Sequence, residues 1–120
     1  GQDCLFPVLA VVDPELMRTV PPKFTAYQGF DALFHSTEGY ISAVTSPMAD
    51  MVQLAAIENI GKYLARAVKD GNDMEAREHV ACANTMSGYS MVVGACTSEH
   101  AMEHAMSAYI RSCRTARGLS

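Results

Sequence analysis

The segment GFDALFHSTEGY, from Gly29 to Tyr40, places an aspartate and a histidine, Asp31 and His35, four residues apart. A second pair, His100 and His104, repeats this spacing further along the chain. On an α-helix, residues i and i+4 share one face about 6 Å apart, so each pair could direct two ligands at one point. A carboxylate with imidazoles suits Zn²⁺ or Fe²⁺ with a coordination position left open. The alternative is a plain helix whose paired polar side chains bond one another.

Two glutamates extend these pairs. Glu103 completes an H-x-x-E-H pattern from His100 to His104, which is typical of zinc peptidases that use the glutamate as general base. Such a site needs a further acidic ligand downstream, and no Asp or Glu follows Glu103. Glu38 lies about one turn beyond His35, where it would orient that imidazole or stand as an ordinary surface carboxylate.

The composition limits the class of protein. The chain has 120 residues, of which 49% are hydrophobic and 18% charged, and this is enough for one domain with a core. A net charge of −4 argues against nucleic acid as the main partner. The apolar run CLFPVLAVV is too short to cross a bilayer, so we expect no membrane association. The four cysteines form no C-x-x-C pair, which favours reduced thiols and a cytoplasmic protein.

The element pattern predicts a mainly α-helical bundle with one β-strand at residues 5–12. The strand needs a partner sheet that the rest of the chain does not supply. After two prolines, Thr25 and Gln28 have the form of a capping box that opens a helix running towards Ser42. Ser46 followed by Pro47 predicts the start of the next helix.

That second helix is expected to end at Gly71, as a left-handed C-cap. Asn72 and Glu75 predict a capping box for a third helix that runs towards Val92, with His79 exposed to solvent among charged residues. On the second helix, apolar or small residues recur every three or four positions and predict its buried face. These residues are Leu54, Ile57, Gly61, Leu64 and Val68.

Taken together, these motifs resemble those of the iron-containing (group III) alcohol dehydrogenases. GFDALFHSTEGYIS resembles the family's G-x-D-A-L-x-H-x-x-E-x-Y signature, and SEHAMEHAMSAY resembles its second histidine-containing signature. PVLAVVDPELMRTVPP resembles the link between the family's nucleotide-binding and helical domains. The resemblance implies part of the helical domain of a dehydroquinate synthase-like fold, preceded by a strand remnant.

The resemblance also implies roles for the paired residues. Asp31, His35 and His100 would bind Fe²⁺ or Zn²⁺, and His104 would lie near nicotinamide and substrate as a proton relay. The implied reaction is hydride transfer between NAD(P) and a primary alcohol or aldehyde, with the metal as Lewis acid. Three readings therefore stay open: the dehydrogenase fragment, the zinc peptidase, and a non-catalytic helical oligomer.

The chain departs from the family pattern at both ends. We expect residues 1–22 to be the strand and linker of a nucleotide-binding domain that is absent, and 23–109 to be a partial metal-binding domain. For residues 110–120, the family has a segment like HPELPHGAGLI where this chain has IRSCRTARGLS. With a suitable choice of codons for IRSCRTARGLS, one restored nucleotide converts the second segment into the first. This predicts a frameshifted tail, with the family's remaining histidine ligand at the position of Thr115.

A partial domain has two expected consequences. Without the dinucleotide loop and the last ligand, the chain alone should be inactive. Helix faces that normally pack on missing neighbours would expose apolar surface, which favours a homo-oligomer.

Overall fold

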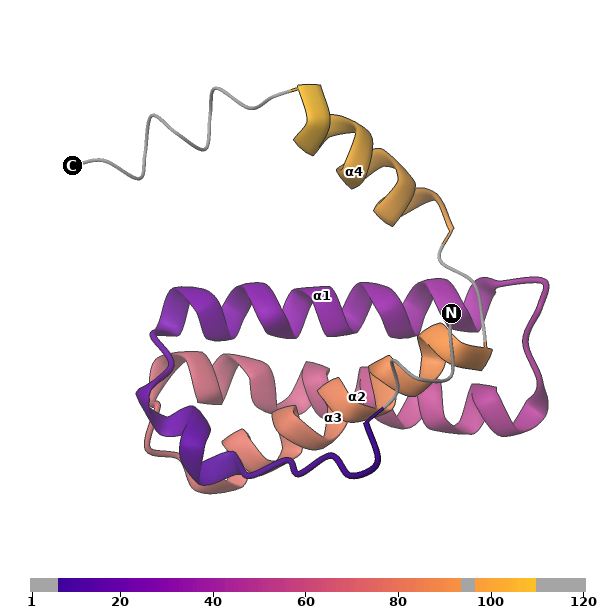
Figure 1. Ribbon diagram of the computed structural model, residues 1–120. Helices are drawn as coiled ribbons and strands as arrows, with labels where there is room; N and C mark the ends of the chain where they lie inside the picture. Colours follow the sequence, from indigo (N-terminus) through magenta and orange to yellow (C-terminus); the bar gives the residue numbers. More distant parts are fainter. Residues whose placement is uncertain (1–6, 94–96, 110–120) are drawn as a thin grey trace.

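The computed structural model describes residues 7–93 and 97–109, and within them the chain forms four α-helices and one 3₁₀ helix. Helices α1, α2 and α3 pack against one another, whereas α4 contacts α1 alone among the described elements (Figure 1). No described helix has the length and apolar character needed to cross a membrane. The elements are η2 (Pro14–Thr19), α1 (Pro22–Ile41), α2 (Pro47–Lys69), α3 (Met74–Val93) and α4 (Ser98–Tyr109).

The mainly α-helical class is confirmed, but the expected strand is not formed over residues 7–12. A strand needs a partner for its backbone N–H and C=O groups, and the described part of the chain contains no other strand. Residues 5 and 6 of the expected strand lie outside the described residues. In the described part of the chain, the bundle is therefore held together by contacts between helices.

Helix α1 presents small side chains to the bundle at alternating steps of four and three residues. Its buried positions include Thr25, Gly29, Ala32, Ser36 and Gly39. A Cβ atom added at Gly29 would lie 2.2 Å from Leu64 Cδ1, and one added at Gly39 would lie 2.6 Å from Gln53 Nε2. The lack of side chains at these two glycines therefore lets α1 and α2 approach closely.

The predicted apolar face of α2 is wrong in register. Of its five residues, Leu64 alone is buried, and Leu54 is 47% exposed. The buried face instead carries Ala49, Gln53, Ala56, Ile60, Leu64 and Ala67. The buried face is displaced by one position from the predicted one, except at Leu64, which belongs to both.

The helix starts were predicted with mixed success. Ser46 caps α2 as expected, because its Oγ accepts a hydrogen bond from the N–H of Ala49 at 3.2 Å. Thr25 does not open α1, which already begins at Pro22, where the proline ring fixes φ near its helical value. The Thr25 hydroxyl instead accepts a hydrogen bond of 2.7 Å from Arg77 Nη1.

The connection from α2 to α3 also differs from the expectation. Helix α2 ends in an extended residue, Asp70, and no described glycine has a positive φ, so the left-handed cap at Gly71 is not formed. Asp73 rather than Asn72 caps α3, with its Oδ1 accepting from the N–H of Ala76 at 3.1 Å. Asn72 accepts instead from Arg18, a residue of η2.

His79 is not the exposed residue expected. Its ring is half-buried between helices, stacked on Tyr63 with 3.9 Å between ring centroids. Its Nδ1 lies 2.7 Å from Asn59 Oδ1. His79 is thus a packing residue of the α2–α3 interface.

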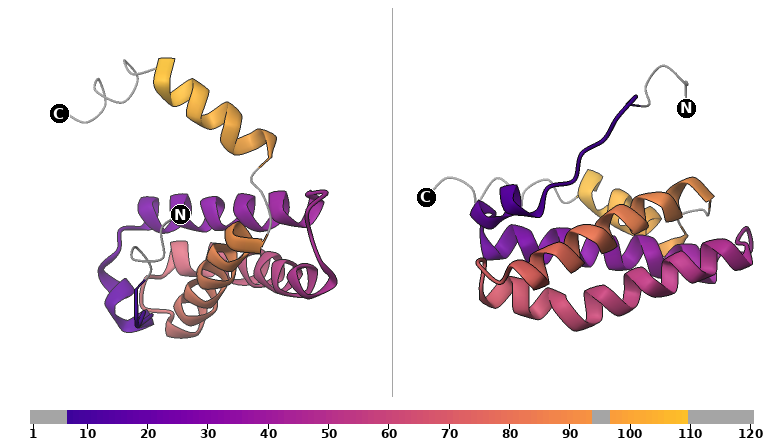
Figure 2. Two further views of the ribbon diagram at one scale, coloured as in Figure 1. Left: turned by 45° about the vertical axis from the view of Figure 1, so that its right-hand side comes forward. Right: turned by 90° about the horizontal axis from the view of Figure 1, so that it is seen from below.

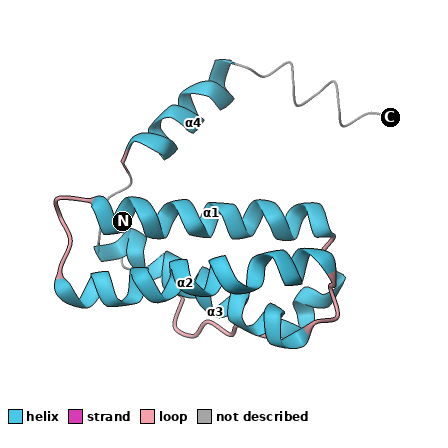
Figure 3. Cartoon of the chain, turned by 180° about the vertical axis from the view of Figure 1, so that it is seen from behind, coloured by secondary structure: helices cyan, strands magenta, loops and turns pink. Residues whose placement is uncertain are grey.

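Helix α4 lies on the side of α1 that faces away from α2 and α3. Figures 1 and 3 show this from the front and from behind, and Figure 2 from a turned view. The residues of α1 that face neither α2 nor α3 are therefore those that α4 can reach.

Candidate metal centre

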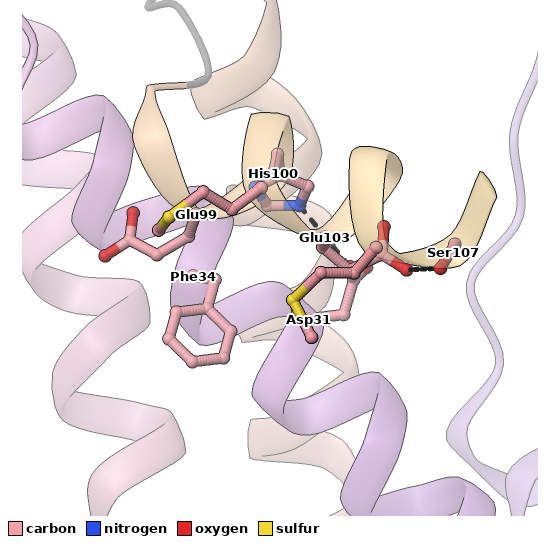
Figure 4. A pocket seen from close by; sticks show the side chains of 8 residues that line it. Asp31, Phe34, Glu99, His100, Glu103 and Ser107 are labelled. Atoms are coloured by element: carbon pink, nitrogen blue, oxygen red, sulfur yellow. Dashed lines mark hydrogen bonds and ion pairs between the residues drawn. The ribbon is translucent and has the colours of Figure 1, made fainter. Parts of the chain in front are cut away.

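The two histidine-containing signatures meet between α1 and α4. Asp31 and His35 lie one turn apart on α1, and His100 lies near the start of α4. The ligand atoms of these three residues all lie within 4.8 Å of one another. His35 Nε2 is 3.4 Å from Asp31 Oδ2, and His100 Nε2 is 3.6 Å from Asp31 Oδ1. Figure 4 shows Asp31 and His100 facing one another from the two helices.

These separations match ligands of one ion better than hydrogen-bonded pairs. Two atoms each bound at 2.0–2.1 Å to a tetrahedral ion are about 3.4 Å apart, whereas an N–H···O bond measures roughly 2.7–3.2 Å. Two imidazoles and one carboxylate are also a ligand set that Zn²⁺ and Fe²⁺ accept. The donor set of Asp31, His35 and His100 therefore fits such an ion.

The two imidazoles of the centre are largely buried, whereas its carboxylate is exposed. The side chains of His35 and His100 are 12% and 15% exposed, and their rings are stacked with 4.0 Å between centroids. The side chain of Asp31 is 61% exposed. Solvent or a substrate would therefore approach the centre from the aspartate side.

Glu38 is fully buried beneath this centre, at the last turn of α1. Its carboxylate accepts hydrogen bonds from the N–H of Thr97 at 2.6 Å and the N–H of His100 at 2.9 Å. Its Oε1 also lies 3.0 Å from Nδ1 of the His100 ring. We expected Glu38 to orient His35, but the structure places it against His100, because the start of α4 packs over the end of α1.

The same contacts set the charges of this pair. Burial raises the pKa of the Glu38 carboxyl, but the N–H of Thr97 and the contacts with His100 outweigh burial and lower this pKa to about 2. Burial lowers the pKa of His100, but the carboxylates of Glu38 and Asp31 outweigh it, so this pKa is raised. Glu38 is therefore an anion at neutral pH.

His104 is not gathered into this cluster. Its side chain is 77% exposed, with Nε2 3.6 Å from Glu103 Oε2, and its ring lies 6.4 Å from that of His100 at 89°. A peptidase of the H-x-x-E-H type requires both histidines on one ion. Among the described residues, His100 meets Asp31 and His35 rather than His104, so the geometry does not favour the peptidase.

A groove of about 560 Å³ opens beside the metal centre between α1 and α4 (Figure 4). Its walls combine three large apolar side chains with five polar ones. Asp31 and His100 belong to both the groove and the centre. The other lining residues are Phe34, Glu99, Met102, Glu103, Met106 and Ser107.

Comparison with known proteins identifies this arrangement. The model of the C-terminal part of the Fe-containing alcohol dehydrogenase family matches residues 25–112. Alcohol dehydrogenase 4 of Schizosaccharomyces pombe is 40% identical over 86% of this chain and 24% of its own length. The NAD-dependent methanol dehydrogenase of Bacillus methanolicus is 39% identical over 82% of this chain and 26% of its own. The chain belongs to the iron-containing alcohol dehydrogenase family.

Solved structures agree with this assignment. An archaeal halo-thermophilic alcohol dehydrogenase from a Red Sea brine pool superposes with a TM-score of 0.87 and 38% identity, over 93% of this chain and 28% of that one. The sulfoacetaldehyde reductase of Bifidobacterium kashiwanohense, solved with NAD⁺, gives a TM-score of 0.85 at 37% identity, over 88% and 28%. The chain spans about a quarter of the length of the curated relatives it matches.

The expectations for the tail stay predictions. Residues 110–120, including Thr115, lie outside the described residues. The frameshift interpretation therefore stays a prediction, and so do the domain boundaries at residues 22 and 109.

Proposed function

We propose that residues 23–109 are the metal-binding helical part of an alcohol dehydrogenase, in which Asp31, His35 and His100 hold Fe²⁺ or Zn²⁺. The observation that carries this proposal is the convergence of the three side chains from α1 and α4. The reaction of the whole enzyme would be hydride exchange between NAD(P) and a primary alcohol or aldehyde. Family membership supports it, since relatives carry names such as methanol dehydrogenase and NADPH-dependent butanol dehydrogenase.

When bound, the metal supplies a Lewis acid that polarises the oxygen of an alcohol or aldehyde. The described residues support this polarisation in two ways. His35 and His100 shield one side of the centre from water, which strengthens electrostatic interactions there. Glu38 Oε1 lies 3.0 Å from Nδ1 of His100, so its contact can hold the ring with Nε2 towards Asp31 and the metal position.

The groove supports a substrate with an apolar carbon chain. Phe34, Met102 and Met106 provide apolar walls, while Asp31 and His100 place the polar end next to the metal position. Methionine side chains are flexible, so such a wall adapts to chains of different length. A primary alcohol or aldehyde has this combination of an apolar chain and one polar end.

We further propose His104 as the proton relay, one helical turn beyond His100 on α4, with Nε2 as the atom that carries the proton. We assign no residue of this chain to NAD(P), because the sequence holds no glycine-rich phosphate loop. We therefore expect the purified 120-residue chain to oxidise no alcohol with NAD(P) above a metal-free control.

The test of the metal site is metal content per chain, measured by mass spectrometry on protein purified without chelator. We expect near-stoichiometric iron or zinc in the parent chain and in His104→Ala, and loss of metal in His35→Ala. His104→Ala is a matched control, because it removes an exposed imidazole of α4 that lies outside the ligand cluster. Substoichiometric metal in all three proteins would contradict the proposal. Loss in His104→Ala with retention in His35→Ala would favour the peptidase instead.

We also propose that the chain associates with copies of itself. Along α1, the side chains of Phe24, Tyr27, Phe30 and Phe34 are all more than 40% exposed. Contiguous apolar surface of this kind typically marks an interaction site.

A further inference from the structure

We propose that Glu38 is a positioning residue that assembles the metal centre, because one carboxylate both caps α4 and orients its ligand His100. This inference rests on the proposed function, since it concerns the same three ligands. It adds a residue that joins the two halves of the site, one on α1 and one on α4.

The first observation is the cap itself. The first N–H groups of an α-helix have no partner within the helix and need an acceptor from elsewhere. In α4 that acceptor is Glu38, which takes the N–H of Thr97 and of His100 from 59 and 62 residues away. The hydroxyl of Thr97, which would be the local cap, is buried without a hydrogen-bond partner in the described part of the chain. An anion at this position is also favoured by the helix dipole.

The second observation is that α4 has few tertiary contacts apart from those with Glu38. Among the described elements, α4 packs on α1 only. Most of its side chains are exposed, including Met102 at 57% and Met106 at 59%. A helix of 12 residues is only marginally stable by itself, so its position depends on the few contacts at its start.

The third observation concerns the ligand. Glu38 Oε1 accepts the backbone N–H of His100 at 2.9 Å and lies 3.0 Å from the Nδ1 of its ring. One oxygen atom therefore accepts from the backbone and contacts the imidazole of the same residue. The other ring nitrogen, Nε2, lies 3.6 Å from Asp31 Oδ1, on the side of the metal position. A purely structural cap would not require this second contact.

The two tasks of Glu38 make metal binding and the order of α4 one linked equilibrium. If the carboxylate holds α4 where His100 can bind, then a metal bound to His100 must in turn stabilise α4, because linkage is reciprocal. Loss of Glu38 should therefore weaken metal binding and loosen the start of α4 together.

The experiment compares Glu38→Gln with Glu58→Gln in the full 120-residue chain. Glu58 is a glutamate of α2 that pairs with Lys62 on the surface, so its substitution controls for loss of one negative charge. Cobalt(II) is the probe, and its absorption reports binding at a tetrahedral site. We expect Glu38→Gln to bind cobalt about 10- to 100-fold more weakly than the parent chain. We expect Glu58→Gln to bind it equally well.

Two measurements without metal keep this inference separate from the proposed function. Hydrogen exchange should show faster exchange of the amides of Thr97 and His100 in metal-free Glu38→Gln than in the parent chain. Imidazole ¹⁵N shifts of His100 should differ between the parent chain and Glu38→Gln, because the carboxylate beside Nδ1 is replaced by an amide. Glu38→Asp, which keeps the charge but shortens the reach, should move all three readouts in the same direction.

If the parent chain binds no cobalt but both metal-free readouts change, the proposed metal function fails while Glu38 is still the positioning residue of His100. If the parent chain binds cobalt and Glu38→Gln binds it equally tightly, the inference is wrong. Faster amide exchange with unchanged His100 ¹⁵N shifts and unchanged cobalt affinity would mean that Glu38 is a helix cap only, and would also overturn the inference.

Discussion

Replacing Gly29 by alanine should separate α1 from α2 and lower the stability of the chain. The added Cβ would lie 2.2 Å from Leu64 Cδ1, 2.7 Å from its Cδ2 and 2.9 Å from its Cγ. Ordinary carbon–carbon contacts are about 3.5–4.0 Å, so Leu64 or the helix must shift by about 1 Å or more. Leu64 is 8% exposed and belongs to the core, so it cannot turn into solvent without cost. Overpacking of this kind costs about 1–3 kcal/mol.

The net effect also contains the helix preference of alanine over glycine, about 0.5–1 kcal/mol in favour of alanine. Gly61→Ala isolates that part, because Gly61 lies within α2 and a Cβ there would meet no atom within 4 Å. We expect Gly61→Ala to be stabilised by about 0.5–1 kcal/mol. The difference in unfolding free energy between the two variants should then equal the overpacking cost, about 1–3 kcal/mol.

The assay is urea unfolding followed by far-ultraviolet circular dichroism, with the parent chain and both variants under one condition. Equal midpoints for Gly29→Ala and Gly61→Ala would refute the close approach of α1 to α2 at Gly29. A double-mutant cycle with Leu64→Ala checks the cause. The cost of Gly29→Ala should largely disappear once Leu64 is shortened, which gives a coupling energy of about 1–3 kcal/mol.

Three further predictions concern the rest of the molecule. The N–H of Ala76 and the guanidinium of Arg66 lower the pKa of the Asp73 carboxyl in the folded chain. Its contribution to folding stability is therefore present above the pKa of the unfolded chain, about 3.9, and is lost as the pH falls through the pKa of the folded chain. The stability advantage of the parent chain over Asp73→Asn should therefore shrink below about pH 4, as urea midpoints from pH 3 to 6 would show. Arg77→Met should cost about 1–3 kcal/mol in thermal unfolding, because it leaves the buried Thr25 hydroxyl and two carbonyl oxygens without their donor. In sedimentation velocity at micromolar concentration the chain should be a dimer or larger, and a monodisperse monomer would contradict the proposed self-association.

The candidate site was predictable where its residues are close in sequence. The spacing of Asp31 and His35 places both on one face of any helix that contains them, whatever else the chain does. Joining that pair to His100 required the resemblance to the alcohol dehydrogenases, because no local rule connects residues 65 positions apart. The partner of Glu38 could not be predicted for the same reason. His35 is its neighbour on the helix, but His100 reaches it only once α4 has packed.

The fold was predictable to a similar extent. Ser46 was identified correctly because a serine before proline and a helix is a complete local signal. Thr25 and Asn72 were wrongly predicted to cap helices, because each bonds an arginine that is distant in sequence. Thr25 accepts from Arg77, and Asn72 accepts from Arg18. The buried face of α2 was misplaced by one position, because the prediction followed large apolar residues such as Leu54 and passed over the buried alanines of this helix, Ala49, Ala56 and Ala67.

The metal centre joins one helix that is firmly packed to one that is not. The half on α1 belongs to a helix held against α2 and α3 by a continuous stripe of small residues, so Asp31 and His35 have a fixed place before any metal binds. The half on α4 belongs to a helix that packs, among the described elements, on α1 only, so part of the binding energy of the metal must be spent on ordering His100. A carboxylate that already fixes His100 in the metal-free chain reduces that cost. The affinity of this site should therefore depend on Glu38, which binds no metal, as well as on the geometry of its three ligands.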